Sequence, residues 1–198
     1  MASGSTYNLP FRRRREQKTD YRKRRAYIVS GKPRMVARPT EKNITVQIVE
    51  AAAQGDRVIA SANSKELSRY GWTAGRGNLP TAYLTGFLAG LRSVRKGVKE
   101  AILDIGLRKA TKGSRIFAAL KGGLDAGLAI PHSAEMLPDD ARVSGGHIAE
   151  YARLLSNDQE AARIVFTQYR KSGLQPEDVP ALFQKVKEKI SEHPEGLG

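Results

Sequence analysis

The stretch at residues 43–63, NITVQIVEAAAQGDRVIASAN, contains two β-type runs on either side of a Gly-Asp turn. In the first run Ile44, Val46 and Ile48 recur at every second position, which is the period of a half-buried strand. The second run, GDRVIASAN, follows the turn directly and is predicted to pair with the first in antiparallel fashion. KPRMVARPT at 32–40 adds another strand, so we predict an antiparallel meander of three strands.

The next part of the chain predicts helices that cross between strands. Pro80 suits the first turn of a helix, and TAYLTGFLAGLRSVRK predicts that helix over 81–96. We then predict a strand at 98–107, a second crossover helix at 111–128 and a fifth, short strand at 128–132. The order β-β-β-α-β-α-β implies an α/β sandwich with a mixed sheet, antiparallel at its start and continued by right-handed parallel crossovers.

The first predicted helix carries a smooth stripe formed by Ala82, Gly86 and Gly90 at a spacing of four. A glycine inside a helix costs about 1 kcal/mol relative to alanine. Two of them therefore indicate that another part of the structure packs very close to this helix. We expect the sheet to be that partner, and a nucleic-acid backbone is the alternative.

The C-terminal part is predicted to be helical. GGHIAEYARLL at 145–155 has the helical apolar period, a second helix is predicted over 157–171, and a third begins at about Pro176. The last helix has an apolar stripe that includes Val179, Phe183 and Val186. We expect this stripe to contact the core, with docking of a partner as the alternative.

The charge is unevenly distributed along the 198 residues, whose formal net charge is +14. Residues 1–32 carry +8, residues 33–155 carry +7 and residues 156–198 carry −1. The chain has no cysteine and no apolar run of the roughly 18 residues that a membrane helix needs. We predict a soluble intracellular protein attracted to polyanions and not to membranes. Its predicted parts are a basic arm at 1–31, an α/β domain at 32–155 and a helical extension at 156–198.

The basic arm is dominated by FRRRREQKTDYRKRR at residues 11–25, where nine Lys or Arg are opposed only by Glu16 and Asp20. Such a run repels itself and cannot bury an apolar face, so we expect it to be disordered alone and ordered by a partner. Arginine pairs with phosphate through two hydrogen bonds, and unpaired RNA bases stack on the aromatic rings interleaved here. We predict RNA or DNA contact; a nuclear-localisation signal or a solvated charge run is the alternative.

Two loops of the body add candidate contacts. TKGSR at 111–115 surrounds a helix start, where free N–H groups and the helix dipole favour an anion, and we predict a polymer phosphate there. SRYGWTAGRGN at 68–78 combines Arg69, Trp72 and Arg76 with glycines, which suits stacking on RNA. A buried tryptophan beside a glycine turn is the other interpretation of this loop.

No pattern of residues predicts a bound metal or cofactor. His132, His147 and His193 lie in different segments and match no zinc-binding spacing. Asp104 and Asp125 are the residues that a metal-dependent nuclease on an α/β sheet would use, and local turns and salt bridges are their simpler role. A chromatin-type DNA binder is a further interpretation of the basic charge.

Several ordered motifs together resemble a known family. PFRRRREQKTDYRKR, KPRMVAR, NLPTAYLTGFLAG, LDIGL, GSRIFAALKGGLDAGLAIPHS and GGHIAEYA are similar to the archaeal–eukaryotic branch of the ribosomal protein L-eighteen family, from about residue 7 to about residue 155. The tail after residue 155 is similar to the archaeal form. The chain departs from the family pattern at Gln17, where RRREGKTDY has glycine, and this departure concerns the backbone turn and not the charge.

The resemblance implies a three-layer α/β sandwich with a mixed sheet, a basic N-terminal arm and C-terminal helices. It implies no catalytic activity and a place in the cytoplasmic ribosome. The implied partners are 5S rRNA, 23S rRNA and neighbouring large-subunit proteins of the central protuberance. RNA contact is carried over to Arg12, Arg13, Arg14, Arg15, Lys18, Tyr21, Lys112, Ser114, Arg115 and Lys121. The charged and aromatic residues predicted beside them are Arg22, Lys23, Arg24, Arg25, Arg34, Arg69, Trp72 and Arg76.

Overall fold

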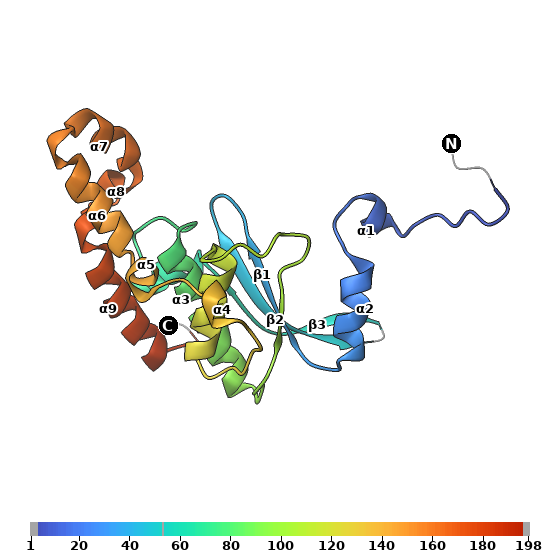
Figure 1. Cartoon of the computed structure of the whole chain (residues 1–198). Coiled ribbons are helices and arrows are strands. Elements are labelled where there is room, and N and C mark those ends of the chain that lie inside the picture. Colours follow the sequence, from blue (N-terminus) through green and yellow to red (C-terminus); the bar gives the residue numbers. More distant parts are fainter. Residues whose placement is uncertain (1–3, 53, 196–198) are drawn as a thin grey trace.

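The computed structural model of the protein describes residues 4–52 and 54–195 and contains one four-stranded sheet (Figure 1). The strands are β1 (Arg34–Pro39), β2 (Ile44–Ala52), β3 (Gly55–Asn63) and β4 (Ile102–Asp104), in the spatial order β3-β2-β1-β4. β2 pairs antiparallel with both β1 and β3, whereas β4 runs parallel to β1. The predicted α/β fold with a mixed sheet is therefore confirmed.

The predicted fifth strand is wrong. Residues 128–132 contribute only an isolated parallel bridge between Ala129 and Glu100. Gly127 precedes this bridge with a φ of +99°, and Pro131 follows it without an N–H to donate. The extended segment is therefore too short for a ladder. β4 is also shorter than predicted, and the turn that follows it contains Gly106 at a φ of +65°.

The two faces of the sheet have different neighbours. On the inner face, buried side chains such as Met35, Val46 and Ala60 pack toward α3 (Leu79–Arg95) and α4 (Arg115–Asp125). The alternate residues of the strands point to the outer face, because successive strand side chains lie on opposite sides. The arm helix α2 (Tyr21–Val29) lies on that outer side (Figure 1). The sheet therefore forms the middle of three layers.

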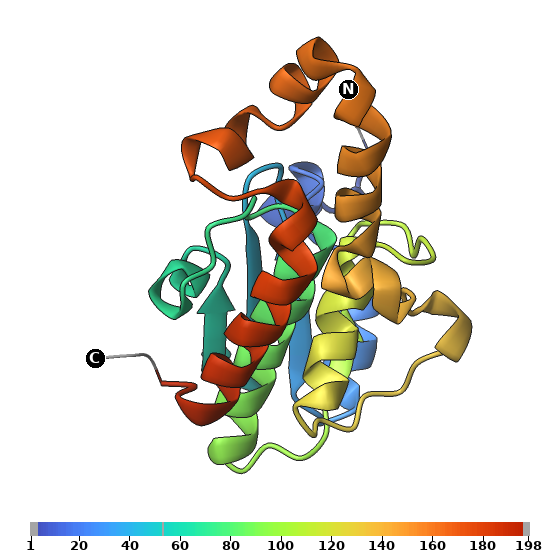
Figure 2. The same cartoon turned by 90° about the vertical axis from the view of Figure 1, so that its left-hand side faces the viewer.

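The glycine stripe of α3 packs against α4, so both partners predicted for it, the sheet and a nucleic acid, are wrong. A side chain at Gly86 would meet the backbone carbonyl of Ala119, and one at Gly122 would meet the carbonyl of Tyr83. A Cβ at Gly90 would lie 2.6 Å from the Cβ of Ala126. The small residues thus bring the backbones of the two helices into close contact. Figure 2 shows α3 behind α9, with α4 beside α3.

The C-terminal part consists of several helices, as predicted, with one difference. They are α5 (Asp140–Ser144), α6 (Gly146–Leu154), α7 (Gln159–Val165), α8 (Thr167–Lys171) and α9 (Val179–Glu192). The single helix predicted over 157–171 is divided at Phe166, whose φ of −99° and ψ of 25° are not helical. The short 3₁₀ helices of the chain are η1 (Glu66–Tyr70), η2 (Ala134–Met136), η3 (Leu155–Asn157) and η4 (Pro176–Asp178).

Helix α9 shares the core of the body. Val179, Phe183, Val186 and Ile190 are buried in the same apolar cluster as the inner face of the sheet. Figure 2 shows α9 running along α3, whereas α7 and α8 extend away from the body beyond α6. The apolar stripe of the last helix therefore contacts the core, as predicted. Within the described residues, no helix is long and apolar enough to cross a membrane.

Candidate nucleic-acid interface

The arm forms two short helices, α1 (Arg12–Arg15) and α2, whose residues are not buried. Asp20 caps α2, because its carboxylate accepts the backbone N–H groups of Arg22 at 3.0 Å and Lys23 at 3.2 Å. Glu16 pairs with Arg12 at 3.1 Å and Lys18 at 2.9 Å. The two acids of the arm thus shape its backbone and neutralise few of its cations. Disorder of the isolated arm stays a prediction, since the arm here packs on the body.

Gln17 makes the turn between these helices in the left-handed region, with a φ of +51°. Two backbone bonds close the turn: Gln17 N–H donates to the Arg14 carbonyl at 3.0 Å, and Lys18 N–H donates to the Arg13 carbonyl at 2.8 Å. This is the Schellman pattern of a helix end, which favours glycine at the position of Gln17. The departure from the family pattern therefore lies at a position where the backbone prefers glycine.

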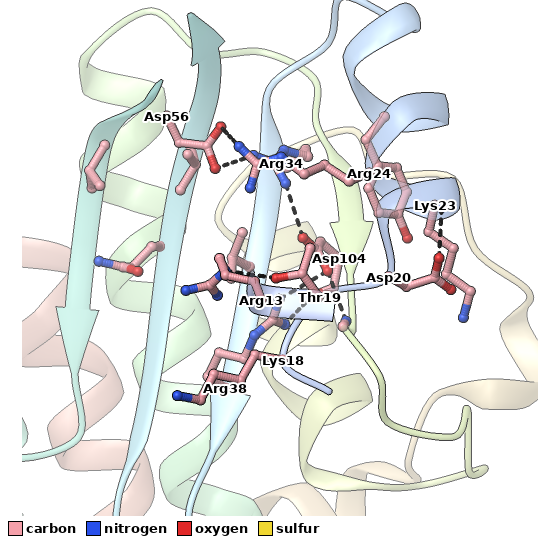
Figure 3. Close-up of a pocket in the computed structure, with 16 residues that line it drawn as sticks. Arg13, Lys18, Thr19, Asp20, Lys23, Arg24, Arg34, Arg38, Asp56 and Asp104 are labelled. Atoms are coloured by element: carbon pink, nitrogen blue, oxygen red, sulfur yellow. Dashed lines mark hydrogen bonds and ion pairs between the residues drawn. The ribbon is translucent and has the colours of Figure 1, made fainter. Parts of the chain in front are cut away.

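A chain of ion pairs connects the arm to the sheet, and we call it the ion-pair chain (Figure 3). Its members alternate in sign along the sequence of contacts Arg24, Asp56, Arg34, Asp104 and Arg38. The nitrogen–oxygen distances in this order are 3.0, 2.8, 3.2 and 3.0 Å. An additional hydrogen bond fixes Asp104, because its Oδ1 accepts the backbone N–H of Gly106 at 2.8 Å. The chain therefore joins α2 to β3, β1 and β4.

A cavity of about 300 Å³ lies between the arm and the outer face of the sheet, and we call it the arm cavity. Six cationic side chains and three aspartates contribute to its wall. The cationic residues are Arg13, Lys18, Lys23, Arg24, Arg34 and Arg38. Val36, Val49 and Val58 supply apolar surface, and Tyr27 lies among them. Burial and then the nearby Asp104 raise the pKa of Tyr27, so its hydroxyl stays neutral. The cavity combines apolar walls with a positive charge.

Arg34 was predicted to contact RNA, and in the structure its contacts are with two carboxylates of the body. It is 4% exposed and bridges Asp56 and Asp104. Its Nη2 lies 2.8 Å from Asp56 Oδ2 but is not in line for a hydrogen bond, and its Nε has no partner. Its guanidinium lies in the wall of the arm cavity and below the outer surface, so it cannot meet a phosphate that stays outside the cavity.

Three further residues that were predicted to contact RNA bond to other groups of this protein. Trp72 is 3% exposed and donates its indole N–H to the Gly75 carbonyl at 3.4 Å, so the buried alternative describes it. Arg115 donates to the carbonyls of Thr40 at 2.8 Å and Gly77 at 2.9 Å. Lys121 pairs with Asp140 at 2.7 Å, which lowers the pKa of that carboxyl. These side chains hold loops together.

The remaining predicted residues lie at or near the surface. The exposed positions are Arg12, Arg13, Arg14, Arg15, Lys18, Arg22, Lys23, Arg25, Arg69, Arg76 and Lys112, while Tyr21 and Arg24 are half-buried. Tyr21 packs on Phe11, with ring centroids 4.9 Å apart and Phe11 69% exposed. The arm therefore exposes most of its cations and an aromatic pair within one short segment, whereas the exposed cations of the body lie in separate loops.

The start of α4 forms a second basic hollow, lined by Arg108, Lys109, Thr111, Ser114 and Arg115. Ser114 is the residue before the helix, but its hydroxyl makes no capping bond and its Oγ is buried without a partner. The sequence pattern indicated this helix start but missed Arg108 and Lys109, which precede the quoted motif. It also missed Arg38, although Arg34, Val36 and Arg38 share the outer face by the period of two.

The two aspartates considered for a nuclease lie in different surroundings. Asp104 is on the outer side of the sheet and pairs with Arg34 and Arg38. Asp125 ends α4 on the inner side and accepts the Tyr83 hydroxyl at 2.5 Å. They cannot share a pair of metal ions in this fold. Within residues 4–52 and 54–195, no cluster of three or more His, Asp or Glu side chains could hold a metal ion.

The fold and the charged surface together define an α/β protein with a cationic arm, of the class that binds polyanions. A family model described as "Ribosomal large subunit proteins 60S L5, and 50S L18" matches residues 5–100 and 92–133. The chain is 51% identical to the large ribosomal subunit protein uL18 of Thermofilum pendens over 193 residues, covering 97% of this chain and 98% of that protein. It is 48% identical to the uL18 protein of Methanothermobacter thermautotrophicus over 97% of this chain and 99% of that protein. The chain therefore belongs to this family of large-subunit ribosomal proteins.

Proposed function

We propose that this protein is a structural component of the large subunit of the cytoplasmic ribosome, where it binds 5S rRNA. In this role it helps to attach 5S rRNA to 23S rRNA in the central protuberance. The observation that carries the proposal is the arm, in which most cationic side chains are exposed and only Glu16 and Asp20 oppose them locally. Membership of a family of large-subunit ribosomal proteins supports it.

The proposed division of labour follows the three parts of the chain. The arm at 1–31 contacts RNA through phosphate pairing, which releases condensed counterions. The α/β domain at 32–155 contributes the basic loops around Arg69, Arg76 and Lys112. The extension at 156–198 has a net charge of −1, so it is not attracted to RNA as the arm is.

Neighbouring ribosomal proteins are the proposed partners of the outer C-terminal helices. Leu154 on α6 is 72% exposed, and Ile164 and Val165 on α7 are 76% and 50% exposed. Apolar side chains grouped on a surface indicate contact with another protein. The protein acts without catalysis in this proposal, so labelled RNA incubated with it and Mg²⁺ should stay intact.

The salt dependence of 5S rRNA binding tests the role of the arm. Arg14 and Arg15 are exposed, and their side chains make no hydrogen bond or ion pair within the described residues. If about six phosphates are contacted, the slope of log K against log salt is about −5. Replacing both arginines by glutamine should reduce the magnitude of this slope by about 1.5 to 2. Filter binding across a salt series measures this slope.

The matched control replaces Arg153 and Arg163, two exposed arginines of α6 and α7, by glutamine. This variant removes the same charge from the molecule, and its slope should stay at the value of the unmodified protein. Equal slopes for all three proteins would contradict the proposal. Duplex DNA as a competitor separates 5S rRNA binding from general attraction to polyanions, because a specific complex should survive at physiological salt.

A further inference from the structure

The arm cavity contains a buried hydrogen-bond donor with no acceptor. Arg34 is 4% exposed, and its Nε has no hydrogen-bond partner within the protein. Buried donors are nearly always paired, because an unpaired one keeps the full cost of leaving water. The Arg34 side chain forms part of the cavity wall. The missing acceptor is therefore expected to come from a molecule that enters the cavity.

The wall of the arm cavity indicates what that molecule is. Its three aspartates are already engaged, because Asp20 caps α2 and Asp56 and Asp104 belong to the ion-pair chain. Six cations against three aspartates leave a net charge of +3. Val36, Val49 and Val58 supply an apolar floor, which a simple phosphate does not need. The wall therefore suits a ligand with one flat apolar part and one anionic part.

The size of the arm cavity and the charges around it narrow the choice of ligand further. A cavity of about 300 Å³ lies at the lower limit of small-ligand sites and has no room for a duplex. Lys23, which lines the cavity, and the exposed arginines of α1 and α2 continue the positive charge beyond it. These cations suit the phosphates of a polymer on either side of the part that enters the cavity. A single unpaired nucleotide meets these conditions, and its base carries carbonyl oxygens or ring nitrogens that accept from a buried N–H.

We infer that the arm cavity receives one unpaired nucleotide of the bound RNA. The base lies on the valine floor beside Tyr27 and accepts from Arg34 Nε, while its phosphate meets Lys18 and Lys23 at the rim. This inference rests on the proposed function and deepens it. The cavity recognises an extruded base, whereas the arginines of α1 contact phosphate only.

Filling the cavity tests the inference. Val58 is on β3, lines the cavity and is 48% exposed, so a Val58→Trp substitution adds bulk there without entering the core. Loss of one stacked base should weaken 5S rRNA binding about tenfold, with the salt slope unchanged because the phosphate of the displaced base keeps its contact with Lys18 and Lys23 at the rim. The matched control is Val165→Trp, a valine 50% exposed on α7. It should bind as the unmodified protein does.

Photo-crosslinking gives a second readout. Ultraviolet irradiation of the complex should attach a nucleotide to the peptide that contains Tyr27, and Val58→Trp should abolish this adduct while Val165→Trp keeps it. Unchanged or increased affinity of Val58→Trp, or an adduct that persists in it, would overturn the inference. A reduced salt slope would also overturn it, because a phosphate would then occupy the cavity. Failure of the unmodified protein to bind 5S rRNA would instead reject the proposed function.

Discussion

At the scale of single residues, Gln17 shows how one position can weaken the geometry of the arm. The Schellman turn after α1 places it at a φ of +51°, where a side chain approaches the following carbonyl. The turn sets the direction in which α1 leaves α2. Its stability therefore decides how firmly the arginines of α1 are held in place.

We predict that Gln17→Gly stabilises this turn by about 1 kcal/mol, because glycine adopts the left-handed conformation without the steric cost. Hydrogen exchange of the Lys18 amide, which donates to the Arg13 carbonyl, should become about fivefold slower. Gln17→Ala is the control, since alanine keeps the strain and removes only the long side chain. Equal protection in the glycine and alanine variants would rule out backbone strain as the cause.

The residue scale also shows where prediction from sequence stopped. The type of a residue indicated which side chains could contact RNA, but not which were already engaged. Trp72, Arg115 and Lys121 have the chemistry of RNA contacts, yet each one meets a group of this protein. Their partners, such as Thr40 and Pro138, are distant in sequence and have no pattern of their own. Only the folded loops bring them together.

At the scale of elements, the strands and helices could largely be predicted, but the contact between α3 and α4 could not. The alternation of Ile44, Val46 and Ile48 predicted β2, and the spacing of Ala82, Gly86 and Gly90 predicted a closely packed helix face. A stripe of small residues indicates a close neighbour without naming it. Both connecting helices lie on the inner face of the sheet (Figure 1). α4 therefore packs against the small residues of α3, where the strands of the sheet were expected.

We predict that Gly86→Ala destabilises the protein by about 2 kcal/mol. Alanine is better than glycine in an isolated helix by about 1 kcal/mol, but here its methyl group would meet the Ala119 backbone, and overpacking against an immobile group costs more. Urea unfolding measures the difference. A gain in stability would show that the two helices are separated more widely than described.

A second contact between α3 and α4 allows one destabilising substitution to be compensated by another. Gly90→Ala would place a Cβ 2.6 Å from the Cβ of Ala126, so it should also destabilise. Changing Ala126 to glycine in the same chain removes the opposing methyl group and should restore part of the loss. The interaction energy between the two substitutions, measured as a double-mutant cycle, tests this contact directly.

At the scale of the whole molecule, the body and its last helix form one core. The sequence predicted the amphipathic face of α9 and favoured the core as its partner, with another molecule as the alternative. In the structure the core is the partner. Phe183 is 3% exposed, and its ring centroid lies 5.4 Å from the ring centroid of Tyr83 on α3. The residues that this face meets could not be predicted, because an apolar face has the same pattern whichever surface it packs on.

We predict that Phe183→Ala lowers the free energy of unfolding of the whole protein by about 3–5 kcal/mol, because it empties part of the shared core. Phe166→Ala is the control: Phe166 is also buried, but it packs on Tyr151 and Tyr169 among the outer helices. It should loosen those helices with little effect on the body. Thermal unfolding, with near-ultraviolet dichroism for Trp72, would distinguish these results. Equal effects of both substitutions would contradict a shared core.

The position of α9 after all the other core elements in the sequence has a consequence for biosynthesis. Domains generally fold while their N-terminal parts emerge during translation. Here the surface of α3 that receives Phe183 stays uncovered until α9 has been made. The core is therefore complete only after α9 has been synthesised, and until then the nascent polypeptide presents an apolar surface that a chaperone would recognise before the newly made protein can join an assembly.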